Sequence, residues 1–474
     1  MKTSPLIIAS LFLASSAAAQ TYEHPTVEVN PQNGSPANVS GYIVSNNGSN
    51  CMTPQCIAFG NGGSADGTIN INTSDRKQRM DGFGYGITGS ASYNLMHMSA
   101  ADRHRFLVKT FSPSEGYGAS YIRVPIGCSD YSLSEYTCRD DRSKPFALTY
   151  EETDYIIPVV KEILEINPNV KVMGSPWTAP RWMKKSNDWT SAELSTSYYQ
   201  EYADYFVSWI KAMQAEGIRI YAITQQNEPL NKGNSASMYM PADQAAAFAK
   251  TLGPTLDNNG LADVKVYCYD HNYDHYEYPI NVYNDQTARQ YIDGAGFHNY
   301  GGSASNMSTV HNQYPDKELI FTEWTAGTWS HGVDISETTS DVKSLVFDVV
   351  KNWGQGAMVW NLMLDDDRGP YRPKGCCTGN GAVDISRSDY KTIVYNSFYY
   401  TMSLASSVIK PGANYIGTSD PTSGVEYVAF DNNDGTHSMV ITNTNGSEKK
   451  IRVNDGGNSF VVTLPANTAG AFIW

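Results

Sequence analysis

Two glutamates stand at the ends of short apolar segments, where a carboxylate is free to do acid–base chemistry. Glu228 lies near the end of Ile220–Leu230, whose alternating Ile and Ala residues predict a short buried strand. Pro229 cannot extend a strand ladder, so Glu228 is expected at the strand's carboxyl end. Glu323 holds the same position in Glu318–Trp324, after another apolar strand. The two residues predict a pair of carboxylates that hold and transfer protons.

The separation of the two glutamates indicates how they come together. They are 95 residues apart (323 − 228), and a strand–helix–strand unit takes about 30 residues. Three such units fill the gap, which places Glu228 and Glu323 on strands n and n+3 of a repeating pattern that fits a barrel. The plain alternative is that each is an ordinary surface glutamate at the start of a loop. Two matching sites argue against that alternative.

Candidate strands recur along the middle of the chain, with helical patterns between them. Tyr198–Met213 has apolar residues at helical spacing, and Thr149 with Glu152 forms a capping box before another helix. Further helical patterns occupy Met240–Leu252 and Ser340–Trp353. The eight candidate strands are Phe83–Thr88, Ser120–Ile126, Val170–Pro176, Ile220–Gln225, Val264–Tyr269, Gly294–Asn299, Leu319–Thr322 and Ala357–Leu362. This alternation over residues 83–362 predicts an α/β fold, the (β/α)8 TIM barrel.

The two ends of the chain have a different character. After Ile393, short strands such as Glu426–Phe430 and His437–Thr442 flank turn signals, here Asn-Asn-Asp-Gly. This pattern predicts a β-sandwich, and the strand-like residues before the barrel are expected to join it. The predicted domains are a signal peptide (1–19), a loosely ordered lead-in (20–60), a side β-sandwich built from both chain ends (61–78 and 394–474) and the catalytic barrel (79–393).

Composition and charge limit the partners. The chain has 474 residues, of which 41% are hydrophobic, and a net charge of −14. So acidic a surface repels nucleic acid and anionic lipid, and neither is expected as a partner. The sequence leaves the oligomeric state open.

The first twenty residues indicate export. They contain one Lys, an apolar stretch at Leu6–Ala14 and small residues at Ala17–Ala19, which predicts a secretory signal peptide cleaved before Gln20. No Cys stands at the cleavage point, and no later apolar run is long enough to span a bilayer. The protein is therefore expected to be secreted, to the extracellular space or a periplasm, without a membrane anchor.

Secretion makes the seven cysteines candidates for disulfide bonds. Two pairs can close short loops, Cys51 with Cys56 and Cys128 with Cys138. The remaining cysteines, of which one must stay unpaired, are Cys268, Cys376 and Cys377. The spacing of Cys and His does not match a zinc site.

Seven ordered motifs resemble those of glycoside hydrolase family 30, a family of retaining barrel hydrolases that includes glucosylceramidase. They are GFGYGITGSA at Gly82, YIRVPIGCSDYS at Tyr121, GSPWTAPRWMK at Gly174, ITQQNEP at Ile223, FHNYGG at Phe297, FTEW at Phe321 and VWNLMLDDDRGP at Val359. The motifs span residues 82–370 and include both glutamates. So many matches in one order are not expected by chance.

The resemblance implies a role for each glutamate. Glu228 corresponds to the acid/base, which must hold a proton for the leaving oxygen and so needs a raised pKa, supplied by an apolar wall that includes Trp177. Glu323 corresponds to the nucleophile, which must stay ionised. Arg123 corresponds to a position beside the nucleophile, where its positive charge favours the carboxylate form. A structural salt bridge is a compatible role for Arg123.

Other residues match sugar-binding positions of the family. Asn227 corresponds to the residue that hydrogen-bonds the sugar 2-hydroxyl, Tyr300 to a tyrosine beside the nucleophile, and His298 to a neighbouring orienting group. The further matches, at sugar contacts or pocket walls, are Asp130, Trp177, Trp360 and Asn361. For Trp177 and Trp360, packing at the top of the barrel is the alternative.

The implied mechanism is a retaining double displacement, with the two carboxyl groups about 5–5.5 Å apart. It needs no metal or organic cofactor. Two polar tracts offer possible metal ligands, but a cleft-lining loop and a polar loop after strand eight are the simpler interpretations. Their residues are His271, His275 and Asp365–Asp367.

The loop after the eighth strand carries what the sequence says about substrate. Residues 365–385, rich in Gly and with two adjacent Cys, resemble the microbial β-1,6-glucanase branch of the family. The expected partner is therefore a β-glucan polysaccharide or oligosaccharide, cleaved at β-1,6 bonds. The alternative within the family is a glucosylceramidase or an exo-acting β-glucosidase. A non-catalytic carbohydrate-binding protein is a remote alternative, because a binder gains nothing from two close carboxylates.

Overall fold

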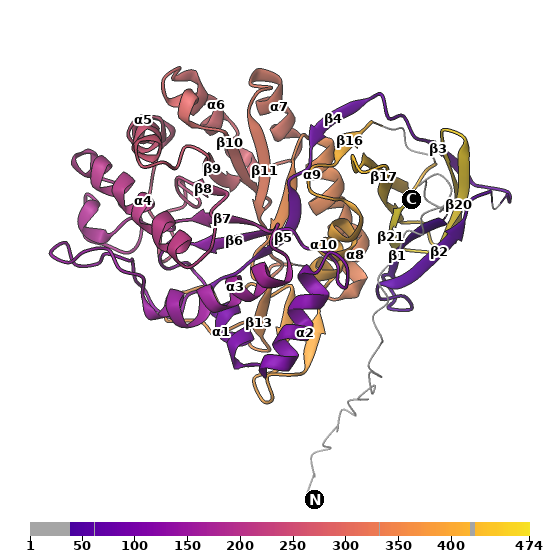
Figure 1. The fold of residues 1–474 in the computed structure, drawn as a ribbon, viewed down its shortest axis with the longest axis horizontal. Coiled ribbons are helices and arrows are strands. Elements are labelled where there is room, and N and C mark those ends of the chain that lie inside the picture. Colours follow the sequence, from indigo (N-terminus) through magenta and orange to yellow (C-terminus); the bar gives the residue numbers. More distant parts are fainter. Residues whose placement is uncertain (1–37, 61, 331, 418–421) are drawn as a thin grey trace, which may run out of the picture.

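The computed structural model describes residues 38–60, 62–330, 332–417 and 422–474. They form a barrel with a smaller all-β domain at its side (Figure 1). The predicted signal peptide (1–19) and the first part of the predicted lead-in (20–37) lie outside the described residues. None of the helices described is long and apolar enough to cross a membrane.

Eight parallel strands close into a barrel in the order β10-β11-β12-β5-β6-β7-β8-β9. Their bounds are β5 Gly82–Gly86, β6 Tyr121–Pro125, β7 Lys171–Ser175, β8 Ala222–Thr224, β9 Lys265–Asn272, β10 Gly294–His298, β11 Glu318–Glu323 and β12 Gly356–Val359. Each coincides with a predicted strand, so the (β/α)8 barrel is confirmed. Glu228 follows the fourth barrel strand and Glu323 ends the seventh, as predicted.

Helices surround the barrel (Figure 1). Their bounds are α1 Gly89–His97, α2 Ala100–Phe111, α3 Ile157–Ile166, α4 Tyr199–Ala215, α5 Ala242–Asn258, α6 Glu277–Asn284, α7 Ser305–Gln313, α8 Thr338–Val342 and α9 Asp348–Lys351. Single π-helical turns precede α3 (Glu152–Ile156) and join α8 to α9 (Lys343–Phe347). The predicted capping box is present, because the Thr149 amide donates to Glu152 Oε2 at 2.8 Å.

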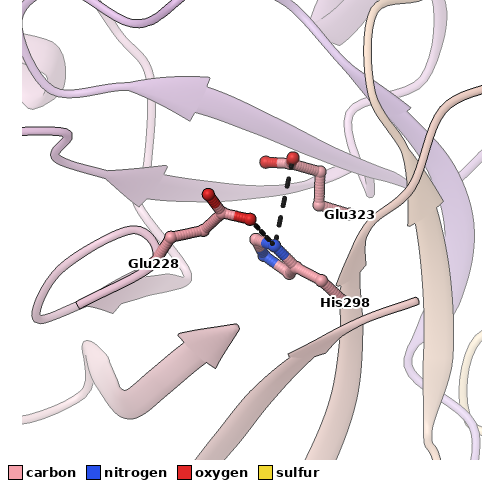
Figure 2. A group of neighbouring side chains, drawn as sticks. All are labelled: Glu228, His298 and Glu323. Atoms are coloured by element: carbon pink, nitrogen blue, oxygen red, sulfur yellow. Dashed lines mark hydrogen bonds and ion pairs between the residues drawn. The ribbon is translucent and has the colours of Figure 1, made fainter. Parts of the chain in front are cut away.

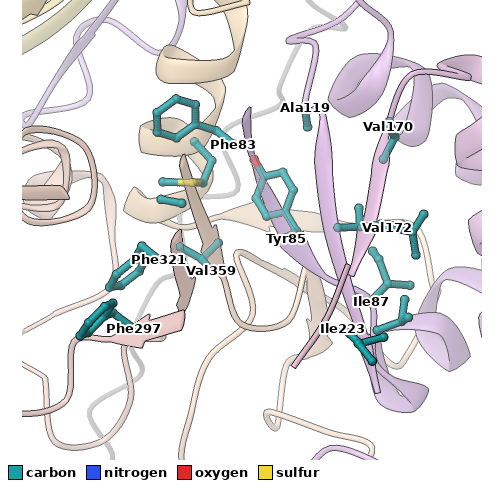
Figure 3. Close-up of a cluster of buried hydrophobic side chains, with 14 of the residues drawn as sticks. Phe83, Tyr85, Ile87, Ala119, Val170, Val172, Ile223, Phe297, Phe321 and Val359 are labelled. Atoms are coloured by element: carbon teal, nitrogen blue, oxygen red, sulfur yellow. The ribbon is translucent and has the colours of Figure 1, made fainter. Parts of the chain in front are cut away.

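Side chains on the barrel strands alternate between the helices and the barrel interior, as the two-residue period of a strand requires. The outward residues, such as Val172 and Ile223, pack in the large core under the helices (Figure 3). The inward residues near the start of the strands form a separate apolar cluster of Tyr121, Met173, Ala222, Tyr267, Ile320 and Met358. Two residues further along, the inward positions are mostly polar. This polar layer carries the site described below.

The side domain is a β-sandwich of a seven-stranded sheet, β2-β1-β21-β18-β17-β16-β4, and a three-stranded sheet, β20-β19-β3. The strands are β1 Asn38–Ser45, β2 Thr53–Ala58, β3 Gly67–Asn70, β4 Arg76–Arg79, β16 Asn414–Ile416, β17 Val425–Asp431, β18 His437–Asn443, β19 Lys449–Asp455, β20 Asn458–Leu464 and β21 Thr468–Ile473. One apolar core joins the two sheets. Because β3 pairs with β19 and β4 with β16, both ends of the chain build the domain, as predicted.

The predicted lead-in is wrong for residues 38–60. β1 is fully buried and pairs with β2 on one side and with β21, at the far end of the chain, on the other. The Asn, Ser, Gly and Pro residues of this region hide a strand whose register is set by pairing with β21, more than 400 residues away.

Residues 394–408 also differ from the predicted strand pattern. Helix α10, Ser397–Val408, contacts barrel strands β5 and β12 and sandwich strands β1, β18 and β21. It therefore joins the two domains. A small sheet of β13 Met363–Asp365, β14 Val383–Ile385 and β15 Ile393–Tyr395 precedes it and frames the loop after the eighth barrel strand.

The predicted disulfides are not formed, because all seven cysteines are free. Cys138 Sγ instead lies 3.5 Å from Glu152 Oε1, and Cys51 Sγ lies 3.5 Å from the Gly48 carbonyl. Burial raises the pKa of Cys128 to about 12, which keeps this thiol protonated.

The close approach of β5 and β6 makes Gly84 a sensitive position. A Cβ at Gly84 would lie 1.7 Å from the Tyr121 carbonyl oxygen on the paired strand. Gly84→Ala is expected to lower the free energy of unfolding by about 1–3 kcal/mol or more, measured as a lower denaturation midpoint. Gly446→Ala, which meets no atom within 4 Å, is the matched control. Equal midpoints for both variants would contradict the strand packing.

Candidate active site

The polar layer of the barrel interior is centred on Arg123. Alternation from the inward Tyr121 on β6 points Arg123 inward too, and its side chain is 0% exposed. The guanidinium donates to Glu323 Oε2, Asn227 Oδ1 and Asp270 Oδ2, each at 2.7 Å, and to Ser175 Oγ at 3.0 Å. Arg123 is thus both the predicted partner of the nucleophile and a structural salt bridge.

Asp270 enters the barrel interior through an irregularity in β9. Alternation from the inward Tyr267 would point Asp270 outward. However, the pairing of β9 with β10 skips one residue, and both Tyr269 and Asp270 have positive φ, 70° and 56°. This bulge turns the Asp270 carboxylate inward, where it also accepts from Thr224 and Thr322.

Asp270 is held as a permanent anion. Burial raises the pKa of its carboxyl group, but the charge of Arg123 and the hydrogen bonds from His298 and Thr322 hold it far below the usual range. An aspartate that cannot be protonated at ordinary pH supplies a fixed negative charge beneath the two glutamates.

Glu228 is presented by a tight turn after β8. Its φ is +44°, a conformation that non-glycine residues rarely adopt, and its amide donates to the Asp270 carbonyl at 2.9 Å. Asn231 Nδ2 donates to Glu228 Oε2 at 2.7 Å. Asn234 Nδ2 donates to the same oxygen at 3.3 Å. Strain of this kind, about 1–3 kcal/mol, persists where surrounding contacts enforce it.

Glu323 faces Glu228 across the pocket (Figure 2). The nearest carboxylate oxygens of the two residues lie within 4.8 Å of each other. This separation is close to the about 5–5.5 Å between the carboxyl groups of retaining glycosidases and well below the about 6.5–9.5 Å of inverting enzymes. Tyr300 donates its hydroxyl to Glu323 Oε1 at 3.2 Å, which places it beside Glu323 as predicted.

His298 lies between the two glutamates (Figure 2). Its Nδ1 is 3.2 Å from Glu228 Oε1 and 3.9 Å from Glu323 Oε1, while Nε2 is 3.0 Å from Asp270 Oδ1. Burial lowers the pKa of His298, but the charge of Glu323 and the hydrogen bonds with Asp270 and Glu228 raise it to about 9. The ring is therefore an imidazolium at neutral pH.

The raised pKa predicted for Glu228 is wrong, because the pKa of this carboxyl group lies below its usual value. Burial raises the pKa of Glu228, but the hydrogen bond and charge of His298, with smaller effects of His271 and Asn231, lower it to about 2. Glu228 and His298 therefore share one proton through their 3.2 Å hydrogen bond. For Glu323, burial raises the pKa, and the charges of His298 and Arg123 offset part of that rise.

These residues border a cavity of about 400 Å³. Of the predicted site residues, Asp130, Glu228, Tyr300, Glu323 and Trp360 line it. The others lie behind this lining as buried side chains: Arg123, Trp177, Asn227, His298 and Asn361. Their predicted roles as sugar contacts stay predictions.

The stacked rings of Trp177 and Trp360 support the floor of the pocket. The rings of Trp177 and Trp360 are 4.9 Å apart at 22°, and Arg123 Cζ lies 5.0 Å from each ring. Trp360 Nε1 donates to Asp130 Oδ1 at 3.2 Å. Burial and the charges of Glu323 and Glu228 raise the pKa of Asp130 to about 7, so this group both donates and accepts hydrogen bonds near neutral pH.

The residues considered as metal ligands lie in two separate places. His271 lines the pocket, and burial lowers its pKa to about 4. Asp366 and Asp367 pair with Arg387 at 3.0 and 3.4 Å. Ligand atoms of Glu228, His298 and Glu323 lie within 4.8 Å of one another.

Sequence reasoning missed Asp270 and several pocket residues. The missed lining residues include Asn231, Asn234, Trp329, Lys374 and Cys376. Asn231 follows Glu228 by three residues, a spacing that a turn brings into contact. The bulge that turns Asp270 inward leaves no such signal in the sequence.

A closed βα barrel with two close carboxylates at the carboxyl ends of strands four and seven has the architecture of the retaining glycoside hydrolases. Residues 80–408 match the glycosyl hydrolase family 30 TIM-barrel domain, and residues 412–471 match the family's β-sandwich domain. The chain belongs to glycosyl hydrolase family 30.

Similar proteins include two fungal enzymes and one enzyme of solved structure. The endo-1,6-β-D-glucanase of Neurospora crassa is 32% identical over 415 residues, covering 81% of this chain and 83% of the relative. An endo-1,6-β-D-glucanase of Aspergillus fumigatus is 31% identical over 420 residues, with the same coverage of 81% and 83%. The solved structure of the endo-β-1,6-glucanase BT3312 has a TM-score of 0.89 and 47% identity, covering 92% of this chain and 99% of that one.

The proton on His298 predicts how kcat/KM depends on pH. In the wild type, kcat/KM is expected to fall as pH rises through about 9, where His298 loses its proton. In His298→Gln, the cation that lowers the pKa of Glu228 is absent, so Glu228 itself holds the proton and loses it at lower pH. The alkaline limb of the kcat/KM profile should move to lower pH by about one unit or more.

His271→Gln is the matched control for this pH profile. His271 lines the same pocket, but its pKa of about 4 lies far from the alkaline limb. The control variant should keep the limb at the wild-type pH whatever its rate. An unmoved limb in His298→Gln would show that His298 does not hold the catalytic proton.

Proposed function

We propose that the protein is a secreted endo-β-1,6-glucanase that hydrolyses β-1,6-glucan with retention of anomeric configuration. The observation that carries the proposal is the Glu228–Glu323 pair, whose oxygens lie within 4.8 Å in an open pocket. The substrate class is supported by the endo-β-1,6-glucanase BT3312, at 47% identity over 92% of this chain. The fungal endo-1,6-β-D-glucanases support it further.

In the first step, Glu323 attacks the anomeric carbon while Glu228 delivers a proton to the leaving oxygen. The proton comes from His298, because Nδ1 faces Glu228 Oε1 at 3.2 Å. Transfer along this hydrogen bond leaves a neutral imidazole that still donates Nε2–H to Asp270. Arg123 and Tyr300 hold Glu323 in position for the attack.

In the second step, Glu228 acts as a base and activates the water that releases the sugar from Glu323. The proton taken from water can return to His298. The role of Asp270 throughout is to keep its negative charge under the imidazole, which fixes the ring's orientation. Asp130, which can donate or accept near neutral pH, is placed to bind a sugar hydroxyl on the pocket floor.

We place the enzyme outside the cell because of its leader. Residues 1–19 combine a single Lys, an apolar stretch and a small-residue end, as signal peptides do. A polymeric glucan also has to be cleaved before it can enter a cell. Protein recovered from the culture medium of its natural host should begin at Gln20 by amino-terminal sequencing. Retention of the intact amino terminus inside the cell would contradict secretion.

Product analysis on linear β-1,6-glucan tests the proposed activity. Short β-1,6-linked oligomers are expected early in the reaction, because an endo-acting enzyme cuts within the chain. Proton NMR at early times should show the β-anomer at the new reducing end, as retention requires. Glu323→Gln, which removes the nucleophile, is the matched inactive control.

Two further substrates test whether the enzyme is specific for β-1,6-glucan. β-1,3-Glucan and glucosylceramide, tested in parallel, are expected to be hydrolysed poorly. Release of glucose from glucosylceramide alone would assign the chain to the glucosylceramidase activity of its family. An initial α-anomer would contradict the retaining mechanism.

A further inference from the structure

The lining of the pocket has a buried part, the floor, and an exposed part, the rim. Trp360 and Glu323 on the floor are 1% and 6% exposed, whereas Tyr300 is 37% and Trp329 is 55% exposed. All four line one cavity. The mechanism above uses the floor and Tyr300 but gives Trp329 no role.

Trp329 is fixed in place despite its exposure. The Gly327–Gly379 bridge joins its turn to the loop after β12, and the Thr328 amide donates to the Thr378 carbonyl at 2.9 Å. A Cβ at Gly327 would lie 2.5 Å from Trp329 Cη2, so the indole rests directly on the Gly327 backbone. Backbone contacts thus hold the turn that carries Trp329, while the ring itself stays exposed.

The indole of Trp329, 55% exposed, lines the same pocket as Glu228 and Glu323 and offers an apolar binding surface there. A tryptophan buries about 150–250 Å² when it is covered, so Trp329 retains much of its apolar surface for a ligand. Among the large aromatic side chains that the structure describes, Trp329 has the highest exposure. The other strongly exposed aromatic rings, Tyr150 and Tyr371, do not line the pocket.

We propose that Trp329 is the stacking platform for the sugar unit next to the one attached to Glu323, and that this second subsite favours a polymer over a single glucoside. The inference rests on the proposed function and names where the glucan chain continues. A pyranose ring has an apolar CH face that packs flat on an indole. Lys374, a donor for its hydroxyl groups, lines the same pocket.

The test compares a long and a short substrate in three variants. The substrates are linear β-1,6-glucan and β-glucosyl fluoride, which has one sugar and no aglycone to reach the rim. Trp329→Ala should lower kcat/KM on the glucan about tenfold or more, mainly through KM, and on the fluoride less than about threefold. Trp329→Phe, which keeps an aromatic face, should give an intermediate loss on the glucan.

Tyr371→Ala is the matched control, since it removes an exposed ring outside the pocket. It should behave like the wild type on both substrates. Circular dichroism and the thermal midpoint check that Trp329→Ala is folded. A selective loss on the glucan supports the second subsite.

Two results would overturn the inference while the proposed function stands. Trp329→Ala with wild-type kcat/KM on the glucan would remove the subsite, and an equal loss on both substrates would place its effect at the cleaved sugar. A separate result concerns the proposed function itself. A wild-type enzyme that hydrolyses the fluoride but not the glucan would overturn the β-1,6-glucanase proposal, and the glucan subsite with it.

Discussion

The buried guanidinium of Arg123 links the side chains of the active site by hydrogen bonds. Arg123 is stripped of water and bonded to Glu323, Asn227, Asp270 and Ser175, which come from four other barrel strands or their ends. Removing one partner of such a buried pair costs about 3–5 kcal/mol, because the remaining charge stays unpaired. The same cation orients one catalytic carboxylate and holds the residue next to the other. The separation of the two glutamates therefore depends on this network more than on either loop.

The fold was predictable where a strand pairs with a strand that is close to it in the sequence. Each barrel strand has an apolar segment followed by a helical pattern, and the two periods can be distinguished in sequence. The sandwich was predictable at its carboxyl-terminal hairpins, where a turn sets the register. It was not predictable at β1, Asn38–Ser45, which pairs with β21 across the whole chain. Helix α10 was missed because it is buried on nearly all sides and so lacks an amphipathic pattern.

The site was predictable in its residues but not in its electrostatics. Motif spacing located Glu228 and Glu323 because both stand at the carboxyl ends of barrel strands. Asp270 escaped notice because a bulge reverses the alternation that places its neighbours. The protonation of Glu228 depends on His298, which lies 70 residues away and approaches only when the barrel closes. A pKa set by such long-range contacts has no local sequence signal.

Trapping the covalent intermediate tests the central claim that this network presents Glu323 as the nucleophile and Glu228 as its acid/base partner. The protein would be incubated with an activated 2-deoxy-2-fluoro-β-glucoside, which forms the glycosyl-enzyme readily but releases it slowly. It would then be digested and mapped by mass spectrometry. A single fluoroglucosyl label is expected on Glu323, within the peptide that contains β11. A label on Glu228 or Asp130, or active enzyme that is never labelled, would contradict this claim.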